Sequence, residues 1–196
     1  PKVFLDTSSL VSPDELNGDL LLMESRNSVR NITAHLLEKG CTLPGFMGDI
    51  GYAQSNRERY EGFCQALMDA GKTPNPSLCL TTPLGIDSYR EEIDSFLSSL
   101  SRMPDAFVCA SDYVACILMQ LLEKRGLRVP EDVAVSGFDN NIEDLLAENL
   151  TTVQVFNEEL GSRLALQILY RIKYPHTPHE VTYLESKVLY RASTGD

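Results

Sequence analysis

Residues 104–154 decide the fold, and they read PDAFVCASDYVACILMQLLEKRGLRVPEDVAVSGFDNNIEDLLAENLTTVQ. The apolar run at residues 106–110 is followed by a helical pattern that ends at Gly126. The apolar face of that predicted helix carries Val114, Ile117, Leu118, Leu121 and Leu122. A second apolar run, residues 133–138, leads to Asp139. Strand, helix and strand over about 30 residues make a βαβ unit, and polar side chains at such strand ends lie where open parallel sheets bind ligands.

The rest of the chain alternates in the same way, which predicts an α/β fold with doubly wound parallel sheets. Strands are expected at residues 3–6, 20–23, 44–48 and 78–81, and helices at 25–39, 56–70 and 88–101. Beyond Asp139 we expect a short helix at residues 142–147 and an extended crossing segment at 151–156. A helix capped by Asn157 should run to Lys173, and a single strand should cover residues 181–190.

Composition and charge exclude several classes of protein. The 196 residues carry 17 Lys and Arg against 28 Asp and Glu, a net charge of −11 that would repel a phosphate backbone. No apolar run approaches the roughly 20 residues of a membrane span, so no membrane partner is expected. Five cysteines without a C-x-x-C pair and three scattered histidines predict no metal site and no cofactor. The cysteines are typical of buried thiols in a reducing compartment, hence a cytoplasmic protein.

Enzymatic motifs are also missing from the sequence. It has no G-x-S-x-G and no glycine-rich phosphate loop. Asp112 and Asp139 could in principle form an acid-base pair, but their spacing in sequence cannot establish one. We therefore expect a binding protein and no enzyme.

Several motifs, in order, resemble one family. They are P-K-V-F-L-D at residues 1–6, R-Y-E-G-F at 59–63, P-D-A-x-x-x-A-x-D at 104–112, G-L-R-V-P-E-D-V-x-V-x-G-F-D at 126–139 and L-T-T-V-Q at 150–154. This series resembles the sensor domain of the lactose-repressor (LacI/GalR) family of bacterial transcription regulators. The runner-up is a periplasmic-type sugar-binding receptor for transport, which shares the fold. Cysteine usage and the last two motifs favour the repressor branch.

The resemblance implies a two-lobe, periplasmic-binding-protein-like fold with a partial N-terminal lobe. Its expected segments are residues 1–40 in the N-terminal lobe, 41–150 in a complete C-terminal lobe, 151–156 as crossover, 157–180 returning to the N-terminal lobe, and 181–196 as last strand and tail on the C-terminal lobe. Family members precede this region with a helix-turn-helix and two βα units, so we expect a fragment that exposes apolar helix faces. The implied partners are a second copy in a homodimer, a small sugar or related metabolite as effector, and operator DNA through the absent N-terminal domain.

The family's effector cleft is matched by residues at predicted strand and helix ends. Asp139 matches the aspartate that accepts hydrogen bonds from effector hydroxyls, and its alternative role is a helix cap or loop ligand. Arg57 and Arg59 open a helix, and one or both should face the cleft with a planar donor fork. Salt bridges within that helix are the alternative for either arginine. Asn56 could cap the helix or contact the effector.

Three further residues complete the expected effector site. Ser111 and Asp112 stand where many relatives have Asn-Asp, and the shorter serine suggests an effector other than the commonest sugars. Asp112 could instead be a first-turn acid that stabilises the helix dipole. Asp6, with the adjacent Thr7, ends a strand of the first lobe at the cleft. No Trp or Phe stands in residues 82–86, where relatives often place an aromatic, and Tyr89 is the nearest candidate.

Overall fold

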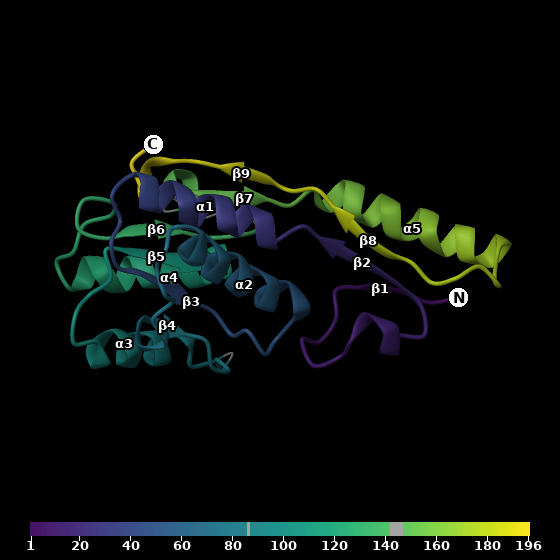
Figure 1. Ribbon diagram of the computed structural model, residues 1–196, viewed down its shortest axis with the longest axis horizontal. Helices are drawn as coiled ribbons and strands as arrows, with labels where there is room; N and C mark the ends of the chain where they lie inside the picture. Colours follow the sequence, from purple (N-terminus) through teal and green to yellow (C-terminus); the bar gives the residue numbers. More distant parts are fainter. Residues whose placement is uncertain (86, 142–146) are drawn as a thin grey trace.

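The structure is a computed structural model that describes residues 1–85, 87–141 and 147–196, and it contains two parallel sheets and a two-stranded antiparallel ribbon (Figure 1). This architecture confirms the predicted α/β class. Most of the helix that we expected at residues 142–147 lies outside the described residues. Within them, Ala147–Asn149 forms the short 3-10 helix η3.

The first sheet has the order β1-β2-β8, with all strands parallel. Its strands are β1 (Val3–Leu5), β2 (Asp19–Met23) and β8 (Val181–Leu184), and the turn η1 (Pro13–Glu15) lies between the first two. Helix α5 (Asn157–Lys173) packs on this sheet, where Leu160 meets Leu21 and Met23. Asp19 binds Arg171 of α5 in an ion pair, and both side chains are buried. The pair fixes the helix to the central strand.

The second sheet has the order β4-β3-β5-β6, again all parallel. Its strands are β3 (Pro44–Met47), β4 (Cys79–Leu80) after the turn η2 (Pro76–Leu78), β5 (Ala106–Cys109) and β6 (Ala134–Ser136). Helices α3 (Tyr89–Ser99) and α4 (Asp112–Lys124) cover one face, and α1 (Arg26–Glu38) and α2 (Gln54–Asp69) cover the other. Strand β5 serves both cores, because Phe107 faces α3 and α4 while Val108 faces α1 and α2.

Helix α1 differs from the predicted division of the chain. We placed residues 1–40 in the N-terminal lobe, but Val29, Ile32 and Leu36 of α1 pack with Phe46 and Phe63 in the core of the second sheet. An apolar stripe shows that a helix is buried on one face without showing which sheet buries it. The chain therefore passes from the first sheet to the second directly after β2.

Two expectations about the C-terminal part were wrong. The single strand expected at residues 181–190 is two strands, since β8 joins the first sheet and β9 (Lys187–Leu189) pairs antiparallel with β7 (Thr152–Gln154). Between them, the Ser186 hydroxyl donates to the carbonyl of Glu24 and holds the crossing chain there. The short helix η4 (Ala192–Thr194) ends the fold. Asn157 is not the cap of α5, because Phe156 occupies that position and no side chain caps the helix.

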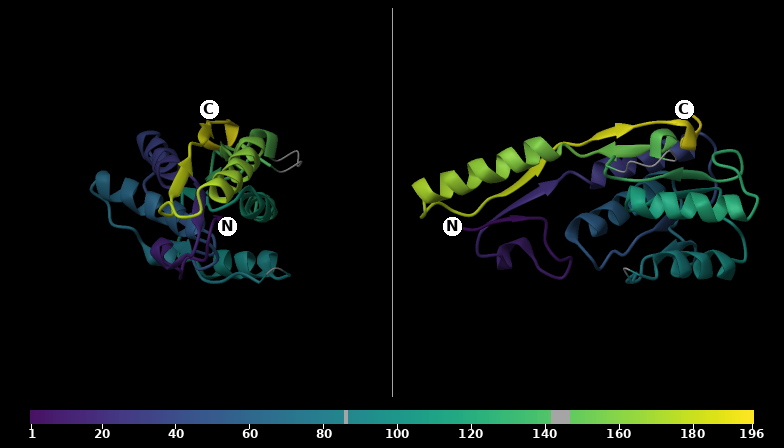
Figure 2. Two further views of the ribbon diagram at one scale, coloured as in Figure 1. Left: turned by 90° about the vertical axis from the view of Figure 1, so that its right-hand side faces the viewer. Right: turned by 180° about the vertical axis from the view of Figure 1, so that it is seen from behind.

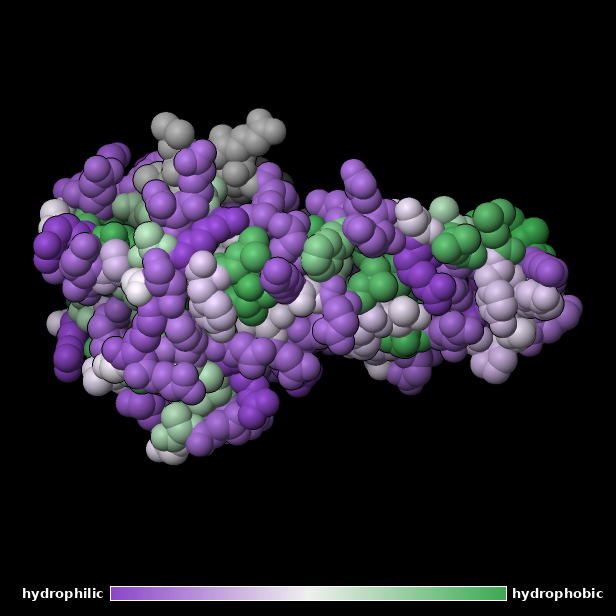
Figure 3. All heavy atoms as spheres, turned by 90° about the horizontal axis from the view of Figure 1, so that it is seen from above, coloured by the Kyte–Doolittle hydropathy of each residue, from purple (hydrophilic) through white to green (hydrophobic). Residues whose placement is uncertain are grey.

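Helix α5 extends from one end of the molecule, while the C-terminus lies at the other end beside the second sheet (Figure 2). Hydrophobic side chains gather at the end of the molecule that α5 forms (Figure 3), where Leu166, Leu169 and Ile172 are 58%, 61% and 61% exposed. The expected exposure of an apolar helix face is thereby confirmed. Over the residues that the structure describes, no helix has the length and apolar character needed to cross a bilayer.

Candidate functional site

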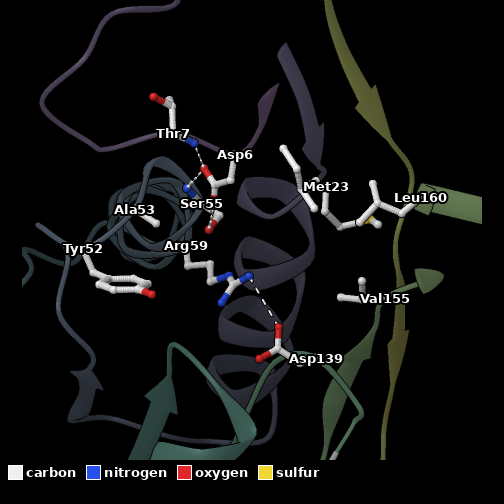
Figure 4. Close-up of a pocket in the computed structure, with 11 residues that line it drawn as sticks. Asp6, Thr7, Met23, Tyr52, Ala53, Ser55, Arg59, Asp139, Val155 and Leu160 are labelled. Atoms are coloured by element: carbon white, nitrogen blue, oxygen red, sulfur yellow. Dashed lines mark hydrogen bonds and ion pairs between the residues drawn. The ribbon is translucent and has the colours of Figure 1, made fainter. Parts of the chain in front are cut away.

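A cavity of about 480 Å³ lies between the two sheets (Figure 4). Asp6 follows β1 and Asp139 follows β6, so the carboxyl ends of strands from both sheets supply its polar groups. The connection from β3 to α2 supplies the wall on the side of Tyr52. The lining residues are Leu5, Asp6, Thr7, Met23, Tyr52, Ala53, Ser55, Arg59, Asp139, Val155 and Leu160.

Asp139 presents a carboxylate with few partners among the residues that the structure describes. Its backbone has a φ of 114°, a left-handed conformation that favours glycine, and its amide donates to the Val153 carbonyl at 3.1 Å. No described group donates a hydrogen bond to the carboxylate, and the nearest cation is Nη2 of Arg59 at 3.6 Å. Burial raises the pKa of Asp139, and the charge of Arg59 opposes that rise. The carboxylate can therefore accept hydrogen bonds from a ligand in the cavity.

Arg59 is held rigidly rather than being a free donor fork. Its guanidinium lies 3.7 Å above the centre of the Phe138 ring, and Nη1 donates to the carbonyl of Ala110. Only 8% of the residue is exposed, and Nε has no hydrogen-bond partner. Burial lowers the pKa of Arg59, although the carboxylate of Asp139 acts in the opposite direction. Because Nε is buried, Arg59 can meet a ligand in the cavity only through its Nη groups and its charge.

Asp6 joins the two sides of the cavity. Its backbone has a φ of 57°, and its carboxylate accepts from the Thr7 amide at 2.7 Å and from the Ser55 hydroxyl at 2.6 Å. The Gln54 amide donates to the Thr7 carbonyl at 2.8 Å, which adds a second bridge. Asp6 therefore lines the cavity as expected, but its carboxylate is already occupied by contacts between the first sheet and α2.

The other expected site residues do not line this cavity. Arg57 lies on α2 with its Nε buried and unpaired, and Asn56 donates to the Asp49 carbonyl at 2.9 Å. Ser111 caps α4 by accepting from the Val114 amide at 3.3 Å.

Asp112, which also lies outside the cavity lining, is only 1% exposed and accepts from the Thr152 hydroxyl at 2.6 Å. Burial raises the pKa of Asp112 to about 6, against the lowering effect of the Thr152 hydrogen bond. Its contacts fit a structural first-turn acid.

Sequence reasoning placed Thr7 at the cleft beside Asp6, and the cavity lining includes it, but it missed Tyr52 and Ser55. One signal was available, because residues 51–55 connect a predicted strand to a predicted helix, and such connections lie at the ligand-binding edge. The aromatic was expected instead after the neighbouring strand, in residues 82–86, with Tyr89 as the nearest candidate.

Comparison with known proteins agrees with this architecture. Residues 33–194 match the family described as periplasmic binding protein-like domain. The chain belongs to this family, in its LacI-type branch. It is 28% identical over 195 residues to the HTH-type transcriptional repressor PurR of Aliivibrio salmonicida, covering 98% of this chain and 57% of that relative. The HTH-type transcriptional regulator DegA of Bacillus subtilis is 31% identical over 158 residues, or 79% of this chain and 46% of the relative.

Solved structures give the same result. A putative LacI-family regulator from Sanguibacter keddieii superimposes with a TM-score of 0.84 at 26% identity, covering 99% of this chain and 72% of that one. The CelR regulator in complex with cellobiose also gives 0.84 at 26%, covering 98% and 58%. These relatives are transcription regulators rather than enzymes. The LacI-type chain spans a little over half the length of the PurR relative.

Proposed function

We propose that this LacI-type chain is the effector-sensing domain of a bacterial transcription regulator. A small hydroxyl-bearing metabolite, a sugar or a related compound, would bind between the two sheets. The bound metabolite would control operator binding by a helix-turn-helix segment of the kind that the names of the relatives mention. The protein would act as a homodimer in the cytoplasm. A transport receptor is not favoured, since the relatives described above are regulators.

The observation that carries this proposal is the carboxylate of Asp139, which accepts no hydrogen bond from the described residues. A carboxylate in a cavity, with Arg59 at 3.6 Å and no described hydrogen-bond donor, offers acceptor positions to a ligand. One carboxylate can accept from two adjacent hydroxyls, which suits a polyol. Arg59 also lines the cavity, and its Nη2 beside the carboxylate can donate to a ring or hydroxyl oxygen. Together they match a ligand group that both donates and accepts.

The signal would arise from a shift between arrangements of the two lobes. Three contacts already join the first sheet and the loop after β1 to α2: the Ser55 hydroxyl to Asp6 at 2.6 Å, the Gln54 amide to the Thr7 carbonyl at 2.8 Å, and the Tyr183 hydroxyl to Glu58 at 2.8 Å. A ligand that touches both sides adds to these contacts only in the closed arrangement, so it favours that arrangement. A helix-turn-helix dimer attached to the first lobe would respond to the difference.

A thermal-shift screen against sugars, sugar phosphates, nucleosides and polyols tests this function, because a ligand that binds only the folded state raises the Tm. We expect a hit whose stabilisation is lost in Asp139→Ala. The matched control is Asp132→Ala, since the Asp132 side chain is 33% exposed against 28% for Asp139 and lies outside the cavity. A hit that Asp139→Ala leaves unchanged would remove Asp139 from the site and this proposal with it.

A further inference from the structure

Arg191 lies in the C-terminal segment that follows β9, and its guanidinium reaches the loop that carries Asp139. Because β9 pairs with β7, the residues after β9 run beside the connection from β6 to β7 (Figure 1). Nη1 of Arg191 donates to the carbonyls of Ala147 at 3.0 Å and Leu150 at 3.1 Å. Nη2 donates to Oδ1 of Asn140, the residue after Asp139, at 2.9 Å. One guanidinium therefore joins the two ends of the connection from β6 to β7.

The backbone that carries Arg191 is itself fixed. Its amide donates to the Thr151 hydroxyl at 2.7 Å, and the Thr151 amide donates to the Ser193 hydroxyl at 2.8 Å. The Ser193 hydroxyl donates in turn to the carbonyl of Val135 in β6 at 2.6 Å. Because this segment is tied to β6 and to the residue before β7, the guanidinium of Arg191 reaches Asn140 from a fixed position.

Asp139 and Asn140 both have left-handed backbones, with φ angles of 114° and 48°. Residues other than glycine keep such conformations only where their surroundings determine them. The Asp139 amide donates to the Val153 carbonyl at 3.1 Å, and Nδ2 of Asn140 donates to Oε1 of Gln154. Since Oδ1 of Asn140 accepts from Arg191, the Asn140 side chain is held between β7 and the C-terminal segment.

We propose that Arg191 is a positioning residue, which acts through Asn140 to fix the backbone of Asp139 and so the direction in which its carboxylate meets the cavity. The shape of the guanidinium matters as well as its charge, because three acceptors surround it and a lysine ammonium lacks the planar fork that meets them together. The consequence for a ligand rests on the sensor function proposed above, whereas the positioning of Asp139 does not.

Amide hydrogen exchange of the 196-residue chain without ligand tests this role. In Arg191→Lys the Asp139 amide should exchange at least about tenfold faster, the usual effect of losing a hydrogen bond to a charged group. The amides of β5 should keep their rates, since the opening is local. The matched control is Arg125→Lys in α4, which should leave the Asp139 amide within about twofold of the unmodified chain. Arg125 likewise donates to two carbonyls and one side chain, those of Leu121, Asp94 and Ser98.

Faster exchange at all amides alike would overturn the proposal, because it would show a general loss of stability. So would faster exchange at Thr151 with no change at Asp139, which would limit Arg191 to holding the C-terminal segment. Asn140→Ala tests the path between Arg191 and Asp139. If Arg191 acts through Asn140, the double variant should exchange at Asp139 within about twofold of Asn140→Ala alone, whereas rates that multiply would refute that path.

The pKa of the Asp139 carboxyl, followed by carbon NMR, separates positioning from charge. Burial raises this pKa, and Arg59 at 3.6 Å opposes the rise. In Arg191→Lys the carboxyl should turn toward solvent, so its pKa should fall toward the usual value. A role of charge alone would leave the pKa unchanged in Arg191→Lys and raise it in Arg191→Gln, and that result would overturn the proposal. Both measurements are made without ligand, so a thermal-shift screen without a hit would count against the sensor function and leave the result for Arg191 in force.

Discussion

Asp112 should make the folded protein less stable as the pH rises through the acid range. The pKa of its buried carboxyl is about 6, against 3.8 for the unperturbed group, and burial is the main cause. The folded state therefore holds the proton more tightly than the unfolded state does, and stability falls as the pH rises from about 4 to about 6. The difference of about 2 pKa units corresponds to about 3 kcal/mol at pH 7.

Asp112→Asn removes this ionisation with little change in shape. The carboxyl of Asp112 accepts from the Thr152 hydroxyl and from the Asn140 amide, and an asparagine can keep both contacts if the hydroxyl turns to accept. The variant should gain up to about 3 kcal/mol at pH 7, or a rise in Tm of up to about 10 °C for a chain of this size. Below about pH 4 the gain should vanish. Urea unfolding from pH 3.5 to 7.5 measures the difference between the two proteins directly.

Asp105→Asn serves as the control of opposite sign. Burial acts to raise the pKa of Asp105, but hydrogen bonds from Cys41 and from the amides of Thr42 and Leu43 outweigh it and hold the pKa below its usual value. That variant should lose stability at pH 7, because an ionised carboxylate is stabilised in the folded state. A difference between Asp112→Asn and the parent that stays constant over the whole pH range would refute the account given for Asp112.

Three further variants probe packing. Asp19→Asn should cost about 3–5 kcal/mol in urea unfolding, because it leaves Arg171 buried without its charge partner. The pKa of Asp19 is about 2, so the stability that its carboxylate gives the unmodified protein should persist down to pH 4 and fade below it. A loss under 1 kcal/mol would show that the ion pair is dispensable. Gly62→Ala should destabilise the protein by about 1–3 kcal/mol, since the new Cβ would lie 2.1 Å from the Arg26 carbonyl where α1 meets α2. The Cβ of Gly161→Ala in α5 meets nothing within 4 Å, so this variant should gain about 0.5–1 kcal/mol of stability. Equal effects of the two variants in thermal melts would contradict the close packing at Gly62.

Periodicity was enough to predict the alternation of strands and helices. The apolar run at β5 and the 3.6-residue pattern of α4 are local signals, and the structure places both elements within a residue or two of the prediction. Local sequence could not predict which sheet α1 packs on, because its apolar stripe of Val29, Ile32 and Leu36 would suit either sheet. The split between β8 and β9 escaped prediction for the same reason, since each half pairs with a strand that is distant in sequence.

The candidate site could be predicted at the level of strand ends, but not residue by residue. Asp6 and Asp139 follow strands and reach the cavity, as parallel topology requires. Asp112 also follows a strand, yet its partner Thr152 lies 40 residues away along the chain and draws the carboxylate into the interior. No sequence pattern around Asp112 predicts that partner. The family motif around Asp139 predicted where this residue lies, but not which groups surround its carboxylate.

The two aspartates differ in how far the described residues engage their carboxylates. Asp112 opens α4, where the helix start and Thr152 engage its carboxylate. Asp139 stands in a loop with a φ of 114°, a conformation that costs an L-residue on the order of 1–3 kcal/mol and that glycine would adopt freely. Among the described residues the carboxylate forms no hydrogen bond, and its interaction is the ion pair with Arg59 at 3.6 Å, so a ligand in the proposed site would find its oxygens open to hydrogen bonds. A backbone held in this way keeps the acceptor oriented before the ligand arrives, which lowers the entropy lost on binding.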